Sequence, residues 1–431
     1  MDVLCPILTI AVKTADYIID SERSAMKKLK ILTIVIAFLV CLTGCQSLLS
    51  NINAYLYADT YDADKYVEQY SNSWHYKQLD ASMKEFYGGM YTAVTDTVNT
   101  DALVEFKDAK GNIQSTDGVR VRFSGAKLTD GDVELLFEAF FRDNPQFFYL
   151  NREYRVEGRS IDGENLYDTI ILQYLFPLVE RRETIQTFNS AIASMLEGAP
   201  QGADQYDTEL YLYDRLAKHC TYNEAAAKTD ADDNPMAYTA YGAVVKGSAV
   251  CEGYAKAMQL LLTQSGIKAT SVSGDALWSN ESHMWNLVEI NGNTYYLDPT
   301  WDDSENIGLH NYFNITTEML NRTHKIDEEY IELPPCRSTA DNYFVRNGTY
   351  INTYERKKIA KIIADQILDG NTQIQLLFSP KTFDNGLLFI QNGNLIFEMV
   401  NEHLSPYDKH LWDFTLLIDK EAYILTIQKA K

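Results

Sequence analysis

Residues 247–255 read Gly-Ser-Ala-Val-Cys-Glu-Gly-Tyr-Ala, which places a thiol where a turn passes into a helix with an apolar stripe. Backbone N–H groups at the start of a helix have no partner within it and lie at the positive end of its dipole. They therefore favour the thiolate form of a cysteine at this position, and a thiolate is a nucleophile. The sequence thus indicates that Cys251 has a chemical reason to ionise and could act as a nucleophile.

Two alternating runs follow this helix and are joined by Asn291-Gly292, the strongest two-residue signal for a β-hairpin. Antiparallel pairing about this turn places His283 opposite Thr300, with Asp298 on the diagonal. Diagonal side chains on one face of a strand pair can reach each other. We therefore expect a hydrogen bond between carboxylate and imidazole, which would fix the tautomer of the histidine.

Three motifs occur in the order cysteine, histidine, aspartate: Gly-x-x-x-Cys-x-Gly-Tyr-Ala around Cys251, His-Met-Trp-Asn from His283, and Leu-Asp-Pro-Thr-Trp around Asp298. Together they resemble the motifs of the transglutaminase-like superfamily, over residues 205–320. The resemblance implies an α+β fold with a papain-like core, in which a helix-borne cysteine packs on a small antiparallel sheet. It also implies that Cys251 is the nucleophile, His283 the base and Asp298 the residue that orients the base.

Each motif also has an ordinary structural explanation. A single cysteine is most often a small buried apolar residue, a single histidine usually forms hydrogen bonds in the core or on the surface, and Asp-Pro-Thr is a common turn. The coincidence of three spaced motifs favours a catalytic triad over these explanations. The sequence has no Cys-x-x-Cys, His-x-x-x-His or glycine-rich phosphate loop, so we expect no metal and no nucleotide cofactor.

Three aromatic residues are candidates for the cleft around this triad. The resemblance implies that an aromatic or amide group near the end of the preceding helix assists the oxyanion, and Tyr222 is the nearest candidate. The backbone N–H of Cys251 is the alternative donor. Trp285 and Trp301 flank the histidine and the aspartate, and they either wall the cleft or fill the core of the small sheet.

The N-terminal region contains a basic segment, an apolar run over residues 31–42, and then Thr-Gly-Cys45. This pattern predicts a secretory signal over residues 26–45, and its end resembles a bacterial lipobox in which Cys45 carries lipid. An uncleaved membrane anchor is the alternative, although the apolar run is short for a span. Residues 1–25 do not fit a signal peptide, and we interpret them as an upstream artefact of start-codon choice. We therefore expect an exported protein, lipid-anchored to the bacterial membrane at the cell envelope.

Charge and cysteine content restrict the partners. The formal net charge of −22 argues against nucleic acid and against anionic lipid. The 29 tyrosines are interpreted mainly as core and half-buried strand positions, with glycan- or peptide-binding surfaces as the alternative. Cys220 and Cys336 are candidates for a disulfide that would leave Cys251 as a free thiol.

Three domains are predicted after the signal: an N-terminal α+β domain at 46–200, a catalytic core at 201–335 and a small C-terminal α+β domain at 336–431. Hydrophobic periodicity and capping residues predict helices at 130–141, 183–196, 207–218 and 355–367. Strands are expected at 170–176, 373–378, 386–390, 395–400 and within 412–427.

These features predict a cysteine hydrolase or acyltransferase that acts on peptide amides through a thioester. Transfer of the acyl group to water would make the protein a protease or amidase, and transfer to an amine would make it a cross-linking enzyme. The sequence slightly favours hydrolysis but does not decide between them. The expected substrate is a peptide or protein at the cell surface, cell-wall peptide included. The alternative is a non-catalytic surface lipoprotein that binds peptide or glycan in the same cleft, and an assembly role in a larger envelope complex is a third, weaker hypothesis.

Overall fold

The computed structural model describes residues 73–429, apart from 102, 108–109, 124–126, 201, 203, 230, 232, 280, 304–308 and 328–331. These residues belong to one compact unit, Lys65–Lys431. The predicted signal segment 26–45 with its lipidated Cys45, and residues 1–25, lie outside the described residues and stay predictions. None of the helices that the described residues form is long and apolar enough to span a membrane.

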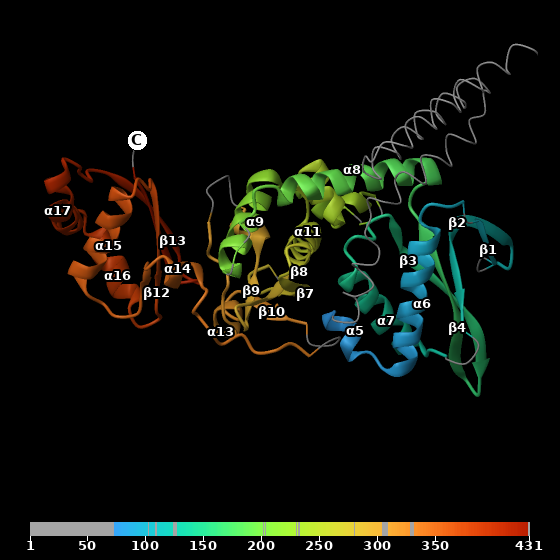
Figure 1. Cartoon of the computed structure of the whole chain (residues 1–431). Helices are drawn as coiled ribbons and strands as arrows, with labels where there is room; N and C mark the ends of the chain where they lie inside the picture. Colours follow the sequence, from blue (N-terminus) through green and yellow to red (C-terminus); the bar gives the residue numbers. More distant parts are fainter. Residues whose placement is uncertain are drawn as a thin grey trace, which may run out of the picture. The chain divides into compact units, whose positions relative to one another are not determined.

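The N-terminal part is built on a four-stranded antiparallel sheet with helices beside it (Figure 1). The strand order is β1 (Leu103–Lys107), β2 (Ile113–Arg122), β4 (Glu164–Tyr174) and β3 (Leu150–Ile161). The helices are α5 (Trp74–Gln78), α6 (Ala81–Thr97), α7 (Asp130–Asp143) and α8 (Leu178–Leu196). Helix α6 packs on β2, and α5 packs on α7.

Capping chemistry sets where these helices begin. Helix α7 begins at the predicted residue, with a capping box between Thr129 and Asp132, and runs two residues beyond the predicted end. Helix α8 begins five residues before the predicted start. Its first turn contains the fully buried Arg181, which pairs with Asp117 at 2.9 Å, so apolar periodicity does not mark this turn.

The middle part is a second antiparallel sheet on which one helix packs. The order is β10 (His324–Ile326), β7 (Lys268–Ala276), β8 (Glu281–Ile290) and β9 (Asn293–Leu297). Helix α11 (Cys251–Gln264) packs on β7 and β8 (Figure 1). The remaining elements are α9 (Gln205–His219), β5 (Thr221–Tyr222), α10 (Glu224–Ala227), η1 (Pro235–Tyr238), η2 (Gly242–Lys246), β6 (Ser248–Ala249), α12 (Pro299–Asp302) and α13 (Thr317–Leu320). The chain therefore has the predicted α+β class, and α9 confirms the helix predicted at 207–218.

The hairpin of β8 and β9 has the predicted register as far as it is paired. It closes on the predicted turn, and its ladder ends at the pair formed by Asn286 and Leu297. The placement of His283 opposite Thr300 was wrong. Strand β9 ends at Leu297 because Pro299 has no N–H to donate to a ladder and the chain enters α12 there.

The C-terminal part has its own sheet, with strand order β11 (Tyr350–Ile351), β12 (Gln373–Phe378), β14 (Ile424–Lys429) and β13 (Phe414–Asp419). Its helices are α14 (Tyr343–Arg346), α15 (Arg356–Leu368), α16 (Phe383–Gln391), α17 (Gly393–Leu404) and η3 (Ser405–Tyr407). Helix α15 and strand β12 confirm the predictions at 355–367 and 373–378.

The strands predicted at 386–390 and 395–400 were wrong, because both segments are helical. A short apolar run does not distinguish a strand from a buried helix. The side chain of Asn392 accepts a hydrogen bond from the backbone of Leu395 and so caps α17. The buried residues of α17 then recur every four positions, at Ile396, Val400 and Leu404, which is helical spacing.

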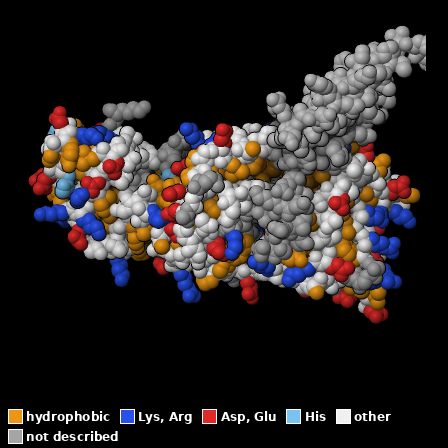
Figure 2. Space-filling view, in the orientation of Figure 1, with side chains coloured by type: hydrophobic (Ala, Val, Ile, Leu, Met, Phe, Trp, Pro, Cys, Tyr) orange, Lys and Arg blue, Asp and Glu red, His pale blue; other side chains and the backbone are white. Residues whose placement is uncertain are grey.

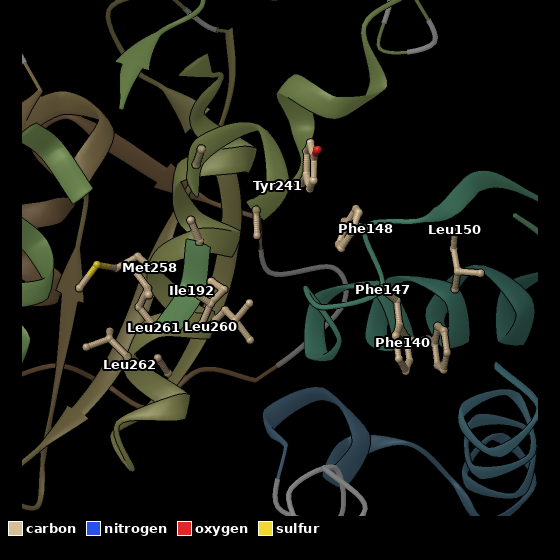
Figure 3. Close-up of a cluster of buried hydrophobic side chains, with 14 of the residues drawn as sticks. Phe140, Phe147, Phe148, Leu150, Ile192, Tyr241, Met258, Leu260, Leu261 and Leu262 are labelled. Carbon is tan, nitrogen blue, oxygen red and sulfur yellow. The ribbon is translucent and has the colours of Figure 1, made fainter. Parts of the chain in front are cut away.

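One hydrophobic cluster extends from Leu79 to Phe313 and crosses the predicted domain boundary at residue 200. At its centre the Phe148 ring lies 4.5 Å from Phe188 and 4.9 Å from Tyr241, and Figure 3 shows part of this packing. Residues 351–427 contribute a separate cluster. The predicted domains 46–200 and 201–335 thus share one core, while the boundaries themselves stay predictions.

The cysteines that the structure describes are all free. Cys220 packs in the large cluster that contains α11, whereas Cys336 packs with Trp285 and Tyr296 in a different cluster. The disulfide considered between Cys220 and Cys336 is therefore not formed, because the two thiols are buried in separate parts of the core.

Candidate active site

The backbone around Cys251 holds this residue at the first position of α11, half-buried. Gly247 turns the chain in a left-handed conformation, with φ of 62°, which a residue with a side chain rarely adopts. Strand β6 then pairs in parallel with β5. The N–H of Val250 donates to the carbonyl of Ala237 at 3.0 Å, which fixes the residue before the nucleophile.

Gly253 explains why a glycine follows two positions after the cysteine. A Cβ at this position would lie 2.6 Å from the carbonyl oxygen of Ala237 and 2.7 Å from Cβ of Ala249. The first turn of α11 can approach the preceding η1 segment only because this side chain is missing. The Cys-x-Gly motif is thus a packing requirement of the helix start.

His283 and Asp298 form a buried pair. The Nε2 atom of His283 lies 2.8 Å from Oδ2 of Asp298, and the two residues are 8% and 1% exposed. The other carboxylate oxygen, Oδ1, accepts hydrogen bonds from the backbone N–H groups of Thr300 and Trp301, at 2.9 and 3.3 Å. Nδ1 of His283 therefore remains as the ring nitrogen that can exchange a proton with Cys251.

The charges of this pair stabilise each other. Burial alone would lower the pKa of His283, but the Asp298 carboxylate outweighs it and, with a hydrogen bond to Cys251, raises the pKa to about 10. Burial alone would likewise raise the pKa of Asp298, but His283 and then His324 hold it below its usual range. At neutral pH the pair is an imidazolium and a carboxylate.

Asn286 connects the strand of the histidine to the helix of the cysteine. Its side-chain amide donates to the carbonyl of Ala255 in α11 at 2.8 Å and to that of Thr270 in β7 at 3.3 Å. Asn286 is fully buried. The final residue of the His-Met-Trp-Asn motif therefore fixes how α11 lies on the sheet.

The three aromatic candidates have different surroundings. Tyr222 pairs with Ala249, two residues before Cys251, and burial followed by the charge of Cys251 raises its pKa, so its hydroxyl remains a donor. Trp285 is fully buried and belongs to the core. Trp301 is half-buried, and its ring lies 5.1 Å from that of His283, which it partly covers.

Sequence reasoning missed two residues beside Asp298. Nε2 of His324 lies 3.2 Å from the same Oδ2 atom that contacts His283. Asp302 accepts hydrogen bonds from the hydroxyl of Tyr213, at 2.5 Å, and from backbone N–H groups. No local spacing marks His324, because it lies on a three-residue strand that follows a loop.

The structure brings ligand atoms of His283, Asp298 and His324 within 4.8 Å of one another, close enough to hold a metal ion. Structural zinc normally has four ligands, and here Oδ2 already accepts from both imidazoles. A metal on these atoms would replace the hydrogen bonds that orient His283. We therefore assign the three residues a hydrogen-bonding role.

Comparison with known proteins gives a match to the transglutaminase-like superfamily over residues 194–299. Two solved structures share limited similarity: a TGase, with 16% identity and a TM-score of 0.26, and a candidate cysteine protease from Cytophaga hutchinsonii, with 14% identity and a TM-score of 0.22. The similarity covers 42% and 35% of this chain, and 50% and 63% of those chains. No curated protein matches the sequence. Residues 194–299 therefore form a domain of the transglutaminase-like superfamily.

Proposed function

We propose that this protein catalyses acyl chemistry on peptide amides, with Cys251 as nucleophile, His283 as acid and base, and Asp298 as the residue that orients His283. The observation that carries the proposal is the 2.8 Å contact between His283 and Asp298, which leaves Nδ1 available to a cysteine at a helix start. The match of residues 194–299 supports a cysteine-based enzyme at the level of the family.

The reaction has two halves. Sγ of Cys251, its proton held on Nδ1 of His283, attacks the carbonyl carbon of the amide. The C–N bond breaks as His283 returns the proton to the leaving amine, and a thioester remains. Water or a second amine then loses a proton to Nδ1 and attacks the thioester, and the C–S bond breaks to release the thiolate.

Two donors are available for the oxyanion that forms in each half. The backbone N–H of Cys251 lies at the start of α11, where helical N–H groups have no partner within the helix. The hydroxyl of Tyr222 is the second candidate, since β5 brings this residue beside the nucleophile. The N–H of Cys251 is part of the backbone, so it remains available as a donor when Tyr222 is substituted.

We place this activity at the bacterial cell envelope, on a peptide or protein substrate, cell-wall peptide included. The location depends on the signal segment 26–45 and on lipid at Cys45. The net charge of −22 supports partners other than nucleic acid. The face in Figure 2 also intermixes acidic and basic side chains over the described surface.

A peptide- or glycan-binding role without catalysis is the second candidate, and one observation favours it. Trp278 is 75% exposed, and its ring lies 6.2 Å from that of Trp301, which in turn covers His283. Exposed aromatic rings offer large apolar faces on which a sugar ring or an apolar side chain can pack. Such a binding protein would not need the thiol.

The test compares the full chain with its Cys251→Ala and Cys336→Ala variants on peptide-amide substrates, with and without an added primary amine. We expect Cys251→Ala to abolish release of the amine, whereas Cys336→Ala retains it because this buried thiol contacts the carbonyl of Pro334 and not the triad. Incorporation of the added amine would identify transfer, and its absence hydrolysis. Turnover by Cys251→Ala would overturn the proposal, and ligand binding without turnover would favour the second candidate.

A further inference from the structure

The carboxylate of Asp298 accepts from a second histidine that the proposed reaction does not use. His324 is 1% exposed, and its Nε2 atom lies 3.2 Å from Oδ2 of Asp298. Nε2 of His283 lies 2.8 Å from the same oxygen. Since two backbone N–H groups donate to Oδ1, the carboxylate accepts four hydrogen bonds.

Only one tautomer of His324 satisfies its neighbours. Its Nδ1 atom lies 2.8 Å from the hydroxyl of Thr323. Burial lowers the pKa of His324, although Asp298 partly opposes this, so the ring is neutral and carries one N–H. A carboxylate only accepts, so the proton is on Nε2. Nδ1 then accepts from the Thr323 hydroxyl, whose other acceptor, the carbonyl of Leu320, lies farther away at 3.3 Å.

The fold holds this ring rigidly. The ring centroids of Trp301 and Trp285 lie 4.1 and 4.8 Å from that of His324. Gly274 on β7 allows β10 to approach, because a Cβ there would clash with the backbone of Lys325. The rotamer and position of His324 are therefore set by packing.

We propose that His324 is a positioning residue that, as a neutral imidazole, donates a second hydrogen bond to Oδ2 of Asp298 and holds the carboxylate in the orientation that serves His283. The inference rests on the proposed function, since it assigns His324 a role in the same reaction. By sharing Oδ2, His324 also reduces the negative charge that Asp298 directs at His283. The imidazolium of His283 then remains acidic enough to protonate a leaving amine.

The titratable groups that face His324 among the described residues come from three segments. They are His283 on β8, Asp298 after β9, and Tyr312, whose ring lies 5.5 Å away. Burial raises the pKa of Tyr312, so this hydroxyl stays neutral. A pH effect of replacing His324 would therefore arise through the pair of Asp298 and His283.

The experiment uses the full chain and its His324→Phe and His324→Gln variants. Phenylalanine fills the site without a donor, whereas the amide of glutamine can replace Nε2–H. We expect His324→Phe to lower kcat on a peptide amide about 10- to 100-fold with little change in KM, and His324→Gln to recover most of this loss. Thermal melting of both variants controls for folding.

Two readouts do not require turnover. The ¹⁵N spectrum of the histidine rings should show His324 neutral at pH 7 with its proton on Nε2. Alkylation of Cys251 by iodoacetamide should require a higher pH in His324→Phe, because an Asp298 carboxylate that has lost one donor directs more negative charge at the imidazolium of His283, which then stabilises the thiolate less. His324→Gln should return the profile toward wild type.

The outcomes separate this inference from the proposed function. A proton on Nδ1, a charged His324 at pH 7, or a glutamine variant as impaired in alkylation profile as the phenylalanine variant would overturn the positioning role. Failure of the wild type to turn over any amide, with the expected tautomer and alkylation shift, would instead count against the proposed function alone.

Discussion

Replacing Asp298 by asparagine removes one charge while keeping the shape of the side chain. The carbonyl of the introduced amide can still accept from the backbone of Thr300 and Trp301. The NH₂ group of this amide then faces the imidazole of His283. The two can form a hydrogen bond only if Nε2 of His283 accepts it. The proton of a neutral His283 moves to Nδ1, so this nitrogen can no longer take the proton of Cys251.

The expected loss of activity follows from the electrostatic coupling between Asp298 and His283. A rise in the pKa of His283 from 6.5 to about 10 corresponds to about 5 kcal/mol, which is an upper bound for a buried, coupled pair. Converted to a rate, this sets an upper limit of about 10³- to 10⁴-fold on the loss in kcat at pH 7. The pKa of His283 should fall toward or below its ordinary value, because burial remains and the carboxylate is gone.

The assay follows alkylation of Cys251 by iodoacetamide against pH, measured by peptide mass spectrometry in wild type and Asp298→Asn. Cys220 and Cys336 serve as internal references, since burial raises the pKa of their thiols to about 12 and about 11. We expect the variant to need a higher pH for alkylation of Cys251.

Asp302→Asn is the matched control. Asp302 is equally buried, and burial raises its pKa to about 7, but its partners are Tyr213 and backbone N–H groups and not His283. This variant should keep the wild-type alkylation profile. An unchanged profile and undiminished turnover in Asp298→Asn would refute the reasoning.

Further predictions concern packing, pH and metal. Gly253→Ala should destabilise the protein by about 1 to 3 kcal/mol in urea unfolding, because its Cβ would overlap backbone and side-chain atoms, whereas Gly131→Ala, which meets open space, should not. The raised pKa of His283 contributes stability that is complete below about pH 6.5 and is lost as pH rises toward about 10. Wild type should therefore lose melting temperature over this range more than His283→Gln does, and an equal loss would contradict the charge pairing. Treatment with a chelator should leave turnover unchanged, and a loss that zinc restores would contradict a thiol mechanism without metal.

Local patterns predicted the parts of the site that local interactions determine. The helix start at Cys251 was predicted from the apolar stripe that follows it, and the register of β8 and β9 from the turn at residues 291–292. The contact between His283 and Asp298 was expected from hairpin pairing. The chain instead leaves the ladder at Leu297, and a turn into α12 brings the carboxylate to the imidazole.

The other features depend on contacts between distant segments, which no spacing in the sequence records. His324 reaches Asp298 because β10 pairs with β7 and lies close to Gly274, where a Cβ would clash with the backbone of Lys325. Helices α16 and α17 were predicted as strands because apolar runs of five or six residues fit either structure. At His324 and in α16 and α17, packing between distant segments determines the structure.

The hydrophobic cluster that joins residues before and after position 200 affects how the chain folds. Phe148 cannot bury its ring fully until Tyr241 has been synthesised and folded against it. Segments far apart in sequence must meet before either is stable, which slows folding and delays it until most of the chain is available. We therefore expect residues 73–200 to depend on chaperones during synthesis, and the thiol of Cys251 to become reactive only in one late, cooperative step.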